Sequence, residues 1–222
     1  MKKMVSSECA SVPCPVTALC IMGHSNAGKS PLGEYLCYSC SGRSERRHHL
    51  DFGEHLRRIA RDDLSYGFDA GDRAYVRTVL DGTLLDDAHF YIARRIIEWF
   101  LNSRGFNREH DLLLLNGIPR HQRQAEGLAR MGVVVGKVIC LSCSPEVALE
   151  RKRLADRGEG HENRRARGDG SIDIFRKKIE SFERETLPLR DYYANAGADI
   201  LYVDVGEKTA PKGMAEQVKD FL

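Results

Sequence analysis

The chain has 222 residues, of which 42% are hydrophobic and 30% charged, and its formal net charge is +2. It is long enough to bury a substantial core without disulfides, and its nearly balanced charge argues against a general binder of nucleic acids or membrane surfaces. Seven cysteines, an odd number, argue against a complete disulfide framework, and no apolar run is long enough for a membrane-spanning helix, so we expect a globular protein of the cytoplasm.

Residues 1–15 contain Ser, Pro and Cys with neither helical nor strand periodicity. The two lysines near the start are not followed by the continuous apolar run of a secretory signal. We therefore expect a flexible N-terminal extension over 1–15, followed by one domain over 16–222.

A phosphate-binding loop is predicted between Ala18 and Leu36. The sequence Gly23-His-Ser-Asn-Ala-Gly28-Lys29-Ser30 has a glycine, four free positions and then Gly-Lys-Ser, between a short apolar run and residues with helical spacing. Glycines let the backbone curl around an anion, and N–H groups at a helix N-terminus point at phosphate oxygens. Lys29 is expected to hold the outer phosphates of ATP, and Ser30 to offer its hydroxyl to Mg²⁺. The residues expected around ATP in this loop are Gly23, Ser25, Asn26, Ala27, Gly28, Lys29, Ser30 and Pro31.

Predicted strands and helices alternate along the rest of the chain. Strands are expected at 18–22, 48–51, 111–116, 133–141 and 198–205. Helices are expected at about 29–40, 54–62, 74–80, 86–101, 121–131, 144–156, 171–195 and 214–222. The alternation predicts an α/β fold of three layers, with a five-stranded parallel sheet between helices and ligands at the carboxyl ends of the strands.

Two stretches depart from this alternation. Residues 53–82 include a loose part rich in glycine and polar residues, and residues 157–170 contain four glycines and several arginines without apolar periodicity. Both are expected to be insertions that overhang the phosphate loop from opposite sides.

Five segments of the sequence, taken in chain order, resemble those of the adenylate kinases and, more broadly, of the nucleoside monophosphate kinases of the P-loop fold. The match runs from Thr17 to the C-terminus. It is carried by GHSNAGKS at 23–30, DFGEHLR at 51–57, DGTLLDD at 81–87, NGIPRHQRQAE at 116–126 and RGDGSIDIFRKKI at 167–179. The resemblance implies a nucleoside monophosphate site in 53–82 and a short lid, lacking the cysteines of a zinc site, in 157–170.

The resemblance also implies roles for individual residues in phosphoryl transfer, which needs positioning and cations rather than a strong base. Arg57 and Arg120 match arginines that clamp the acceptor phosphate, while Arg157, Arg167 and Lys178 match cationic positions that close on the transferring group. For the donor base, Arg153 is favoured over Arg151 because it shares a helix face with Arg157. Gln124 matches a glutamine that reads the acceptor adenine. The residues expected around AMP are Phe52, Gly53, Arg57, Leu85, Gly117, Arg120 and Gln124.

Several positions depart from the family pattern. Ser30-Pro31 stands where the family usually has Gly-Thr, Phe52 replaces a threonine near the acceptor base, and Lys178 replaces an arginine. Asn116 stands where an aspartate usually organises magnesium-bound water. We expect Ser30 and Asn116 to hold Mg²⁺, largely through water and the phosphates.

Three hypotheses follow. The first is a kinase that transfers the terminal phosphoryl group of ATP to AMP. The second keeps the reaction and changes the acceptor to CMP, UMP or another small phosphate. The third is a nucleotide-binding regulator with weak turnover, suggested by Phe52, Asn116 and Lys178. The arginines at 164, 165 and 167 lack interleaved aromatic residues, so we expect nucleotides as partners rather than nucleic acid or membrane, and a monomer.

Overall fold

The computed structural model describes residues 14–39, 45–80, 83–159 and 171–222. Most of the expected N-terminal extension, residues 81–82 of the first insertion and residues 160–170 of the expected lid, with Arg167, lie outside the described residues.

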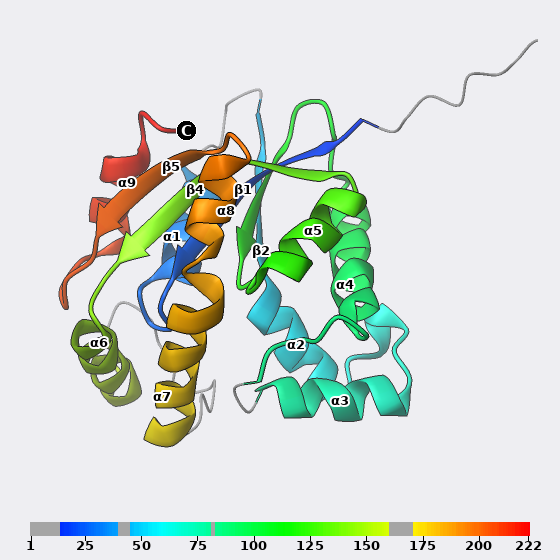
Figure 1. The fold of residues 1–222 in the computed structure, drawn as a ribbon, viewed down its shortest axis with the longest axis horizontal. Helices are drawn as coiled ribbons and strands as arrows, with labels where there is room; N and C mark the ends of the chain where they lie inside the picture. Colours follow the sequence, from blue (N-terminus) through cyan, green and yellow to red (C-terminus); the bar gives the residue numbers. More distant parts are fainter. Residues whose placement is uncertain (1–13, 40–44, 81–82, 160–170) are drawn as a thin grey trace, which may run out of the picture.

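A five-stranded parallel sheet forms the centre of the protein, as the sequence predicts (Figure 1). The strands lie in the order β2-β3-β1-β4-β5, and every neighbouring pair is parallel. Their bounds are β1 Val16–Gly23, β2 Arg47–Asp51, β3 Leu112–Asn116, β4 Val133–Ser142 and β5 Asp199–Asp204. This order places the carboxyl ends of β2, β3 and β1 side by side, where the phosphate loop follows β1.

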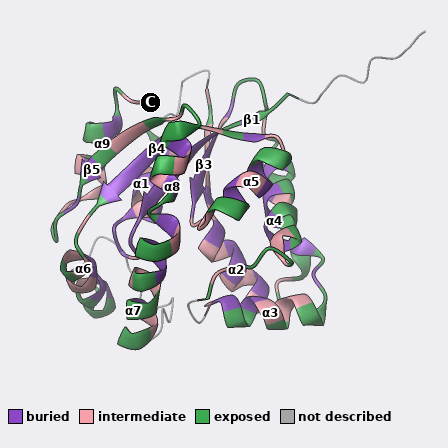
Figure 2. Ribbon diagram, viewed as in Figure 1, coloured by how far each residue is buried: buried purple, intermediate pink, exposed green. Residues whose placement is uncertain are grey.

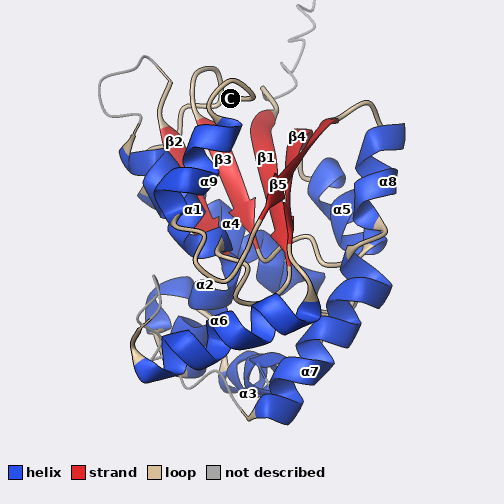
Figure 3. Ribbon diagram, turned by 90° about the vertical axis from the view of Figure 1, so that its left-hand side faces the viewer, coloured by secondary structure: helices blue, strands red, loops and turns tan. Residues whose placement is uncertain are grey.

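Helices cover both faces of the sheet and also extend beyond its carboxyl edge. Helices α1 and α9 lie on one face and α4, α5 and α8 on the other, while α2, α3, α6 and α7 project past the ends of the strands (Figures 1 and 3). The helix bounds are α1 Lys29–Tyr38, α2 Phe52–Ala60, α3 Ala70–Leu80, α4 Phe90–Ser103, α5 Gln122–Arg130, α6 Pro145–Arg157, α7 Ile172–Ser181, α8 Leu189–Asn195 and α9 Pro211–Val218.

Alternate residues of the strands pack into different parts of the core. On β3, Leu114 belongs to the cluster formed with α1 and α9, whereas Leu113 and Leu115 face α2 and α4. Burial on both faces explains why the sequence of β3 is an unbroken apolar run rather than an alternating one. Figure 2 shows the buried residues along the strands and on the inward sides of the helices.

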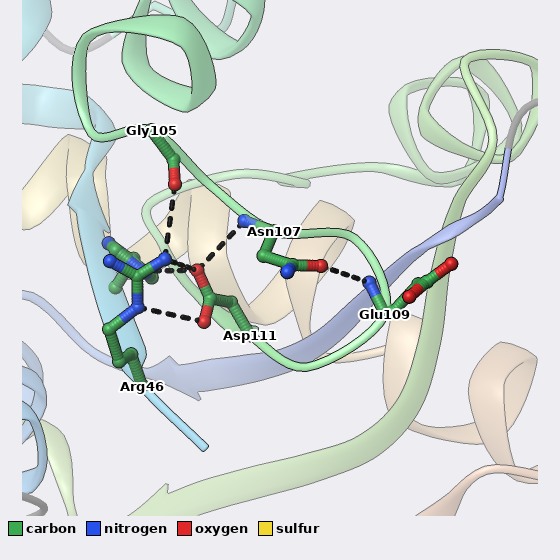
Figure 4. A network of polar contacts seen from close by, with 6 residues as sticks. Arg46, Gly105, Asn107, Glu109 and Asp111 are labelled. Atoms are coloured by element: carbon green, nitrogen blue, oxygen red, sulfur yellow. Dashed lines mark hydrogen bonds and ion pairs between the residues drawn. The ribbon is translucent and has the colours of Figure 1, made fainter. Parts of the chain in front are cut away.

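A network of polar contacts fixes the amino ends of β2 and β3 relative to each other (Figure 4). Asp111, which is 4% exposed, accepts hydrogen bonds from the Arg46 guanidinium at 2.8 and 3.1 Å and from the Asn107 N–H at 2.9 Å. His48 Nε2 lies 3.0 Å from the same carboxylate. Burial opposes ionisation of Asp111, but these contacts outweigh it and hold the pKa of the carboxyl below its ordinary value. The network thereby supports the register that pairs Asp51 with Asn116 at the other end of the two strands.

The prediction of a single helix over 171–195 is wrong, because the structure divides this segment into two helices. Helix α7 passes into a π-helical turn at Phe182–Thr186, and α8 begins after Pro188. Pro188 has no N–H to continue the regular hydrogen-bond ladder, and the N–H of Leu187 instead donates to the carbonyl of Phe182 at 2.8 Å.

Smaller differences concern the residues at which helices begin. Helix α3 begins at Ala70 rather than 74, α4 at Phe90 rather than 86 and α9 at Pro211 rather than 214.

None of the helices in the described part of the chain is long and apolar enough to cross a membrane. The described cysteines are free thiols. Burial raises the pKa of Cys20 to about 12 and that of Cys140 to about 11, so both are neutral thiols in the core.

Close packing between α1 and β2 predicts opposite effects for two Gly→Ala substitutions within helices. A Cβ on Gly33 would lie 2.4 Å from His49 Cδ2 and 2.7 Å from its Cγ, whereas a Cβ on Gly213 would meet nothing within 4 Å. Gly33→Ala should therefore destabilise the protein by about 1–3 kcal/mol through overpacking. Gly213→Ala should stabilise it by roughly 0.5–1 kcal/mol. Urea unfolding measures both values, and equal gains in the two variants would contradict the packing argument.

Candidate functional site

The phosphate loop joins β1 to α1 through a backbone that requires glycine. Gly28 is the N-cap of α1, with φ 98° and ψ 19°, and a Cβ there would lie 2.9 Å from Met214 Cε. The first N–H groups of an α-helix are in general available to an anion at its N-terminus, which here follows the loop. The Lys29 ammonium donates to the carbonyls of Gly23 at 2.8 Å and His24 at 2.7 Å, which holds its positive charge against the loop.

A cavity of about 170 Å³ brings together most of the residues expected at the site. It lies between the phosphate loop, the carboxyl ends of β2 and β3, and α2, α3 and α7. The predicted residues that line it are Ser25, Asn26, Lys29, Ser30, Phe52, Gly53, Arg57, Leu85, Asn116, Gly117, Arg120, Gln124 and Lys178. Gly23, Ala27, Gly28 and Pro31 belong to the loop and the first turn of α1 without lining the cavity.

Arg120 is a desolvated cation at the wall of this cavity. Its Nε is buried and has no hydrogen-bond partner in the described part of the chain, and burial lowers the pKa of the guanidinium. A guanidinium stays protonated even so. The backbone of Arg120 is held on two sides, because its carbonyl accepts from Thr186 Oγ1 at 2.8 Å and its N–H donates to Gln124 Oε1 at 2.8 Å. A guanidinium whose Nε is buried without a partner at the wall of a cavity favours an anionic ligand.

Gln124 is 2% exposed, and both of its polar atoms contact backbone. Its Oε1 accepts from Arg120 N, and its Nε2 donates to Leu85 O at 2.9 Å. The side chain thus joins the segment before α4 to the segment before α5. To recognise a nucleotide base, the Gln124 amide would have to use the remaining hydrogen of Nε2 or give up one of its two hydrogen bonds to backbone.

Ser30 and the carboxyl ends of β2 and β3 form a second group of polar contacts. Ser30 Oγ donates to Asp51 Oδ2 at 2.5 Å, and Asn116 Nδ2 donates to Ser30 Oγ at 3.1 Å. Asp51 was not among the expected site residues, although it ends a strand beside Asn116 and lines the cavity. The expectation that Asn116 helps to hold a metal does not fit this orientation well, because its amide nitrogen faces Ser30.

Asp51 remains ionised despite its surroundings. Burial opposes ionisation, but the bond from Ser30, the charge of Arg57 and the Glu54 N–H outweigh burial and lower the pKa of the carboxyl. Arg57 Nη2 lies 3.9 Å from Asp51 Oδ1, and Arg57 Nε donates to Glu54 at 2.9 Å. The described residues that line the cavity therefore include a half-buried carboxylate, Asp51, among several cations.

Helix α6 carries three arginines with different surroundings. Arg151 is buried, and its guanidinium donates to Asn26 O in the phosphate loop at 2.8 Å and to Gly206 O after β5 at 2.9 Å. Arg153 is half-exposed and contacts Glu150 at 3.2 Å. Arg151 contacts the phosphate loop because it lies on the buried face of α6, whereas the expected contact of Arg153 with the donor base stays a prediction. Arg157 also lies outside the cavity, 3.1 Å from Glu159.

His24, the second residue of the loop, is 6% exposed and packs on Phe182 of the π-helical turn, with 4.4 Å between ring centroids. Burial, and then the charge of Lys29, lower the pKa of His24 to about 4. Glu183 lies 3.9 Å away but does not reverse this shift. His24 is therefore neutral at pH 7, and the loop's positive charge comes from Lys29 and its N–H groups.

The five-stranded parallel sheet and the loop after β1 are consistent with the three-layer fold of a P-loop kinase. Comparison with known proteins narrows this class. No family model matches the sequence. The chain is similar to the adenylate kinase of Bifidobacterium longum, with 32% identity over 100 residues, which span 42% of this chain and half of that protein.

Longer matches have lower identity. The adenylate kinase of Synechococcus sp. is 29% identical over 81% of this chain and 85% of that protein. The adenylate kinase of Mesoplasma florum is 25% identical over 88% of this chain and 96% of that protein. The chain is thus similar to adenylate kinases over most of its length, at low identity. These relatives support a function as a nucleotide kinase.

The burial of neutral His24 predicts a loss of stability in mild acid. The folded-state pKa of about 4 lies below the ordinary 6.5, so the unfolded chain binds the proton more readily. The contribution is present above pH 6.5 and is lost as the pH falls toward 4. Between pH 7 and 5, the free energy of unfolding of the wild type should fall by about 2 kcal/mol more than that of His24→Gln.

Urea unfolding at pH 7, 6 and 5 measures this difference. His110→Gln is the matched control, because the His110 side chain is 68% exposed. The explanation fails if His24→Gln keeps the full pH dependence of the wild type.

Proposed function

We propose that the protein transfers the terminal phosphoryl group of ATP to a nucleoside monophosphate, with AMP as the acceptor and two ADP as products. The observation that carries the proposal is the shared cavity. Lys29 of the phosphate loop lies on the same cavity as Arg57 of α2, Arg120 of the loop after β3 and Lys178 of α7. A cavity with cations from separate elements suits two phosphorylated ligands that meet at one point.

Each group has a role that requires only positioning and charge. Lys29 and the N–H groups of α1 bind the donor phosphates, and Arg57 and Arg120 orient the acceptor phosphate, whose oxygen attacks in line. Lys178 adds charge where the group is transferred. The 53–82 segment supplies α2 and α3 as the acceptor side of the site. Arg157 would reach the phosphates only if the C-terminal end of α6 moved toward the cavity, and Arg167 of the proposed lid lies outside the described residues.

The residues present fit a magnesium ion bound together with ATP. The Ser30 hydroxyl and the Asp51 carboxylate lie 2.5 Å apart at the phosphate loop, and hard oxygen donors are the ligands that magnesium prefers. No group of three or more His, Cys, Asp or Glu that could hold a metal occurs in the part of the chain that the structure describes, which fits an ion held mainly by phosphates and water. When bound, Mg²⁺ supplies positive charge to the donor phosphates.

One observation favours a second acceptor class. Because Gln124 Oε1 and Nε2 both contact backbone, and Phe52 packs in the core at 4% exposure, few free polar atoms face an acceptor base. A site that discriminates bases weakly would accept CMP or UMP as well as AMP. A regulator with weak turnover is the remaining alternative.

Diphosphate formation with each acceptor separates these alternatives. The purified protein should convert ATP and AMP to ADP in the presence of Mg²⁺, and AMP should give the highest kcat/KM. Higher kcat/KM with CMP or UMP would replace the proposed acceptor. Absence of transfer to every monophosphate, with ATP bound, would leave the regulator.

Charge removal on the two sides of the cavity should have different kinetic signatures. Lys29→Met should lower kcat by about 100-fold or more, because a cation at the transferred group is lost. Arg120→Lys should raise KM for the monophosphate by roughly 10- to 100-fold, since a point charge cannot replace the guanidinium fork. Lys177→Met is the matched control, because Lys177 is exposed and does not line the cavity. An unchanged kcat in Lys29→Met would contradict the role of the loop.

A further inference from the structure

The direction of the hydrogen bonds at Ser30 follows from the chemistry of its neighbours. The ionised Asp51 can only accept, so the 2.5 Å contact between Ser30 Oγ and Asp51 Oδ2 uses the serine hydrogen. The second contact of Ser30 Oγ, at 3.1 Å to Asn116, must therefore be donated by the amide nitrogen. Ser30 Oγ keeps a lone pair in this arrangement, and Asn116 acts as a donor.

The neighbours of Asn116 support the same orientation. Its Nδ2 lies 3.3 Å from His49 Nε2, which accepts when the imidazole is neutral. The His49 ring is in turn fixed against α1, because a Cβ on Gly33 would lie within 2.4 Å of it. Asn116 is thus held with its nitrogen between Ser30 and His49.

Asp51 is fixed equally well, but with an oxygen toward the loop. Its Oδ1 accepts from the Glu54 N–H at 3.0 Å and caps α2, which leaves Oδ2 at Ser30. Asp51 pairs with Asn116 across β2 and β3, so its carboxylate lies one strand away from Asn116 and beside the same serine. A P-loop protein holds Mg²⁺ with the loop serine and an aspartate at the end of a neighbouring strand.

We propose that Asp51, at the end of β2, supplies the carboxylate of the magnesium site together with Ser30, and that Asn116 is a positioning residue that orients Ser30. This inference rests on the proposed function, since it assigns residues to the ion that accompanies ATP. The negative charge needed near the ion is present at this site, on β2 rather than on β3.

The alternative is a structural role in which Asp51 only caps α2 and ties it to α1. Asn caps helices about as well as Asp, so Asp51→Asn keeps the cap and removes only the charge. A structural role would change stability without changing how strongly the metal and the nucleotide favour each other's binding.

The test measures binding of a non-hydrolysable ATP analogue by calorimetry, once with EDTA and once with Mg²⁺. The ratio of the two affinities is the metal coupling. Asp51→Asn should lower this ratio by about 10- to 100-fold while the metal-free affinity stays unchanged or rises. Titration of Mn²⁺ into the analogue complex, followed by electron paramagnetic resonance, should show the same loss of metal affinity.

Two further variants make the result specific. Glu183→Gln removes a carboxylate near the loop, beside His24 rather than Ser30, and should leave the ratio unchanged. Asn116→Ala should lower it by less than about 3-fold, because the carboxylate remains. Should Asp51→Asn fail to fold, Asn116→Ala alone decides, since a loss of 10-fold or more there would assign the metal to Asn116 and overturn the inference.

The outcomes for the inference and for the proposed function are distinguishable. A wild-type protein that binds no ATP analogue under either condition contradicts the nucleotide kinase itself. A wild-type protein with metal-dependent binding, and an Asp51→Asn variant with the same metal coupling, contradicts only the role of Asp51.

Discussion

The hydrogen bond between Ser30 and Asp51 joins the two sides of the site. Ser30 lies in the first turn of α1, directly after the phosphate loop, and Asp51 caps α2, which begins the proposed acceptor side. The bond, 2.5 Å long, joins residues that are 21 positions apart in the sequence. The strands that precede and carry them, β1 and β2, are not neighbours in the sheet. Because β3 lies between β1 and β2, this contact is possible only where the strands end and their helices turn toward each other. The geometry of the cavity therefore depends on strand register as much as on the loop itself.

The register between β2 and β3 is supported at their amino ends. Asp111 and Arg46 fix the amino ends of β2 and β3, and a slip of one residue there would turn the side chain of Asp51 to the other face of the sheet. Among the described residues that line the cavity, Asp51 then lies beside cations such as Lys29, Arg57 and Arg120. Such an excess of positive charge is unfavourable for the folded protein by itself and becomes favourable when phosphates are bound.

The parts of the structure that depend on local sequence could be predicted. The phosphate loop, the buried run of β3 and the serine cap of α6 are signals within a few residues, and the structure confirms the five parallel strands. The importance of Asp51 and the orientation of Asn116 could not be derived in this way, because both depend on which residues of distant strands face each other. The contact between Arg151 and the phosphate loop could not be derived either, because helix periodicity groups residues on a face but does not say which face of α6 is buried.

The π-helical turn at 182–186 shows how a local irregularity contributes to the site. A regular helix continued through this stretch would rotate its later residues relative to the sheet, because a π turn inserts one extra residue. In the observed arrangement Thr186 Oγ1 reaches the carbonyl of Arg120 at 2.8 Å, and Phe182 packs on His24. This one turn thus contacts both the backbone of Arg120 and the imidazole of His24 in the phosphate loop. Helix α7, which carries Lys178, is therefore connected through this turn to Arg120 and to the phosphate loop, and a shift of α7 would displace both.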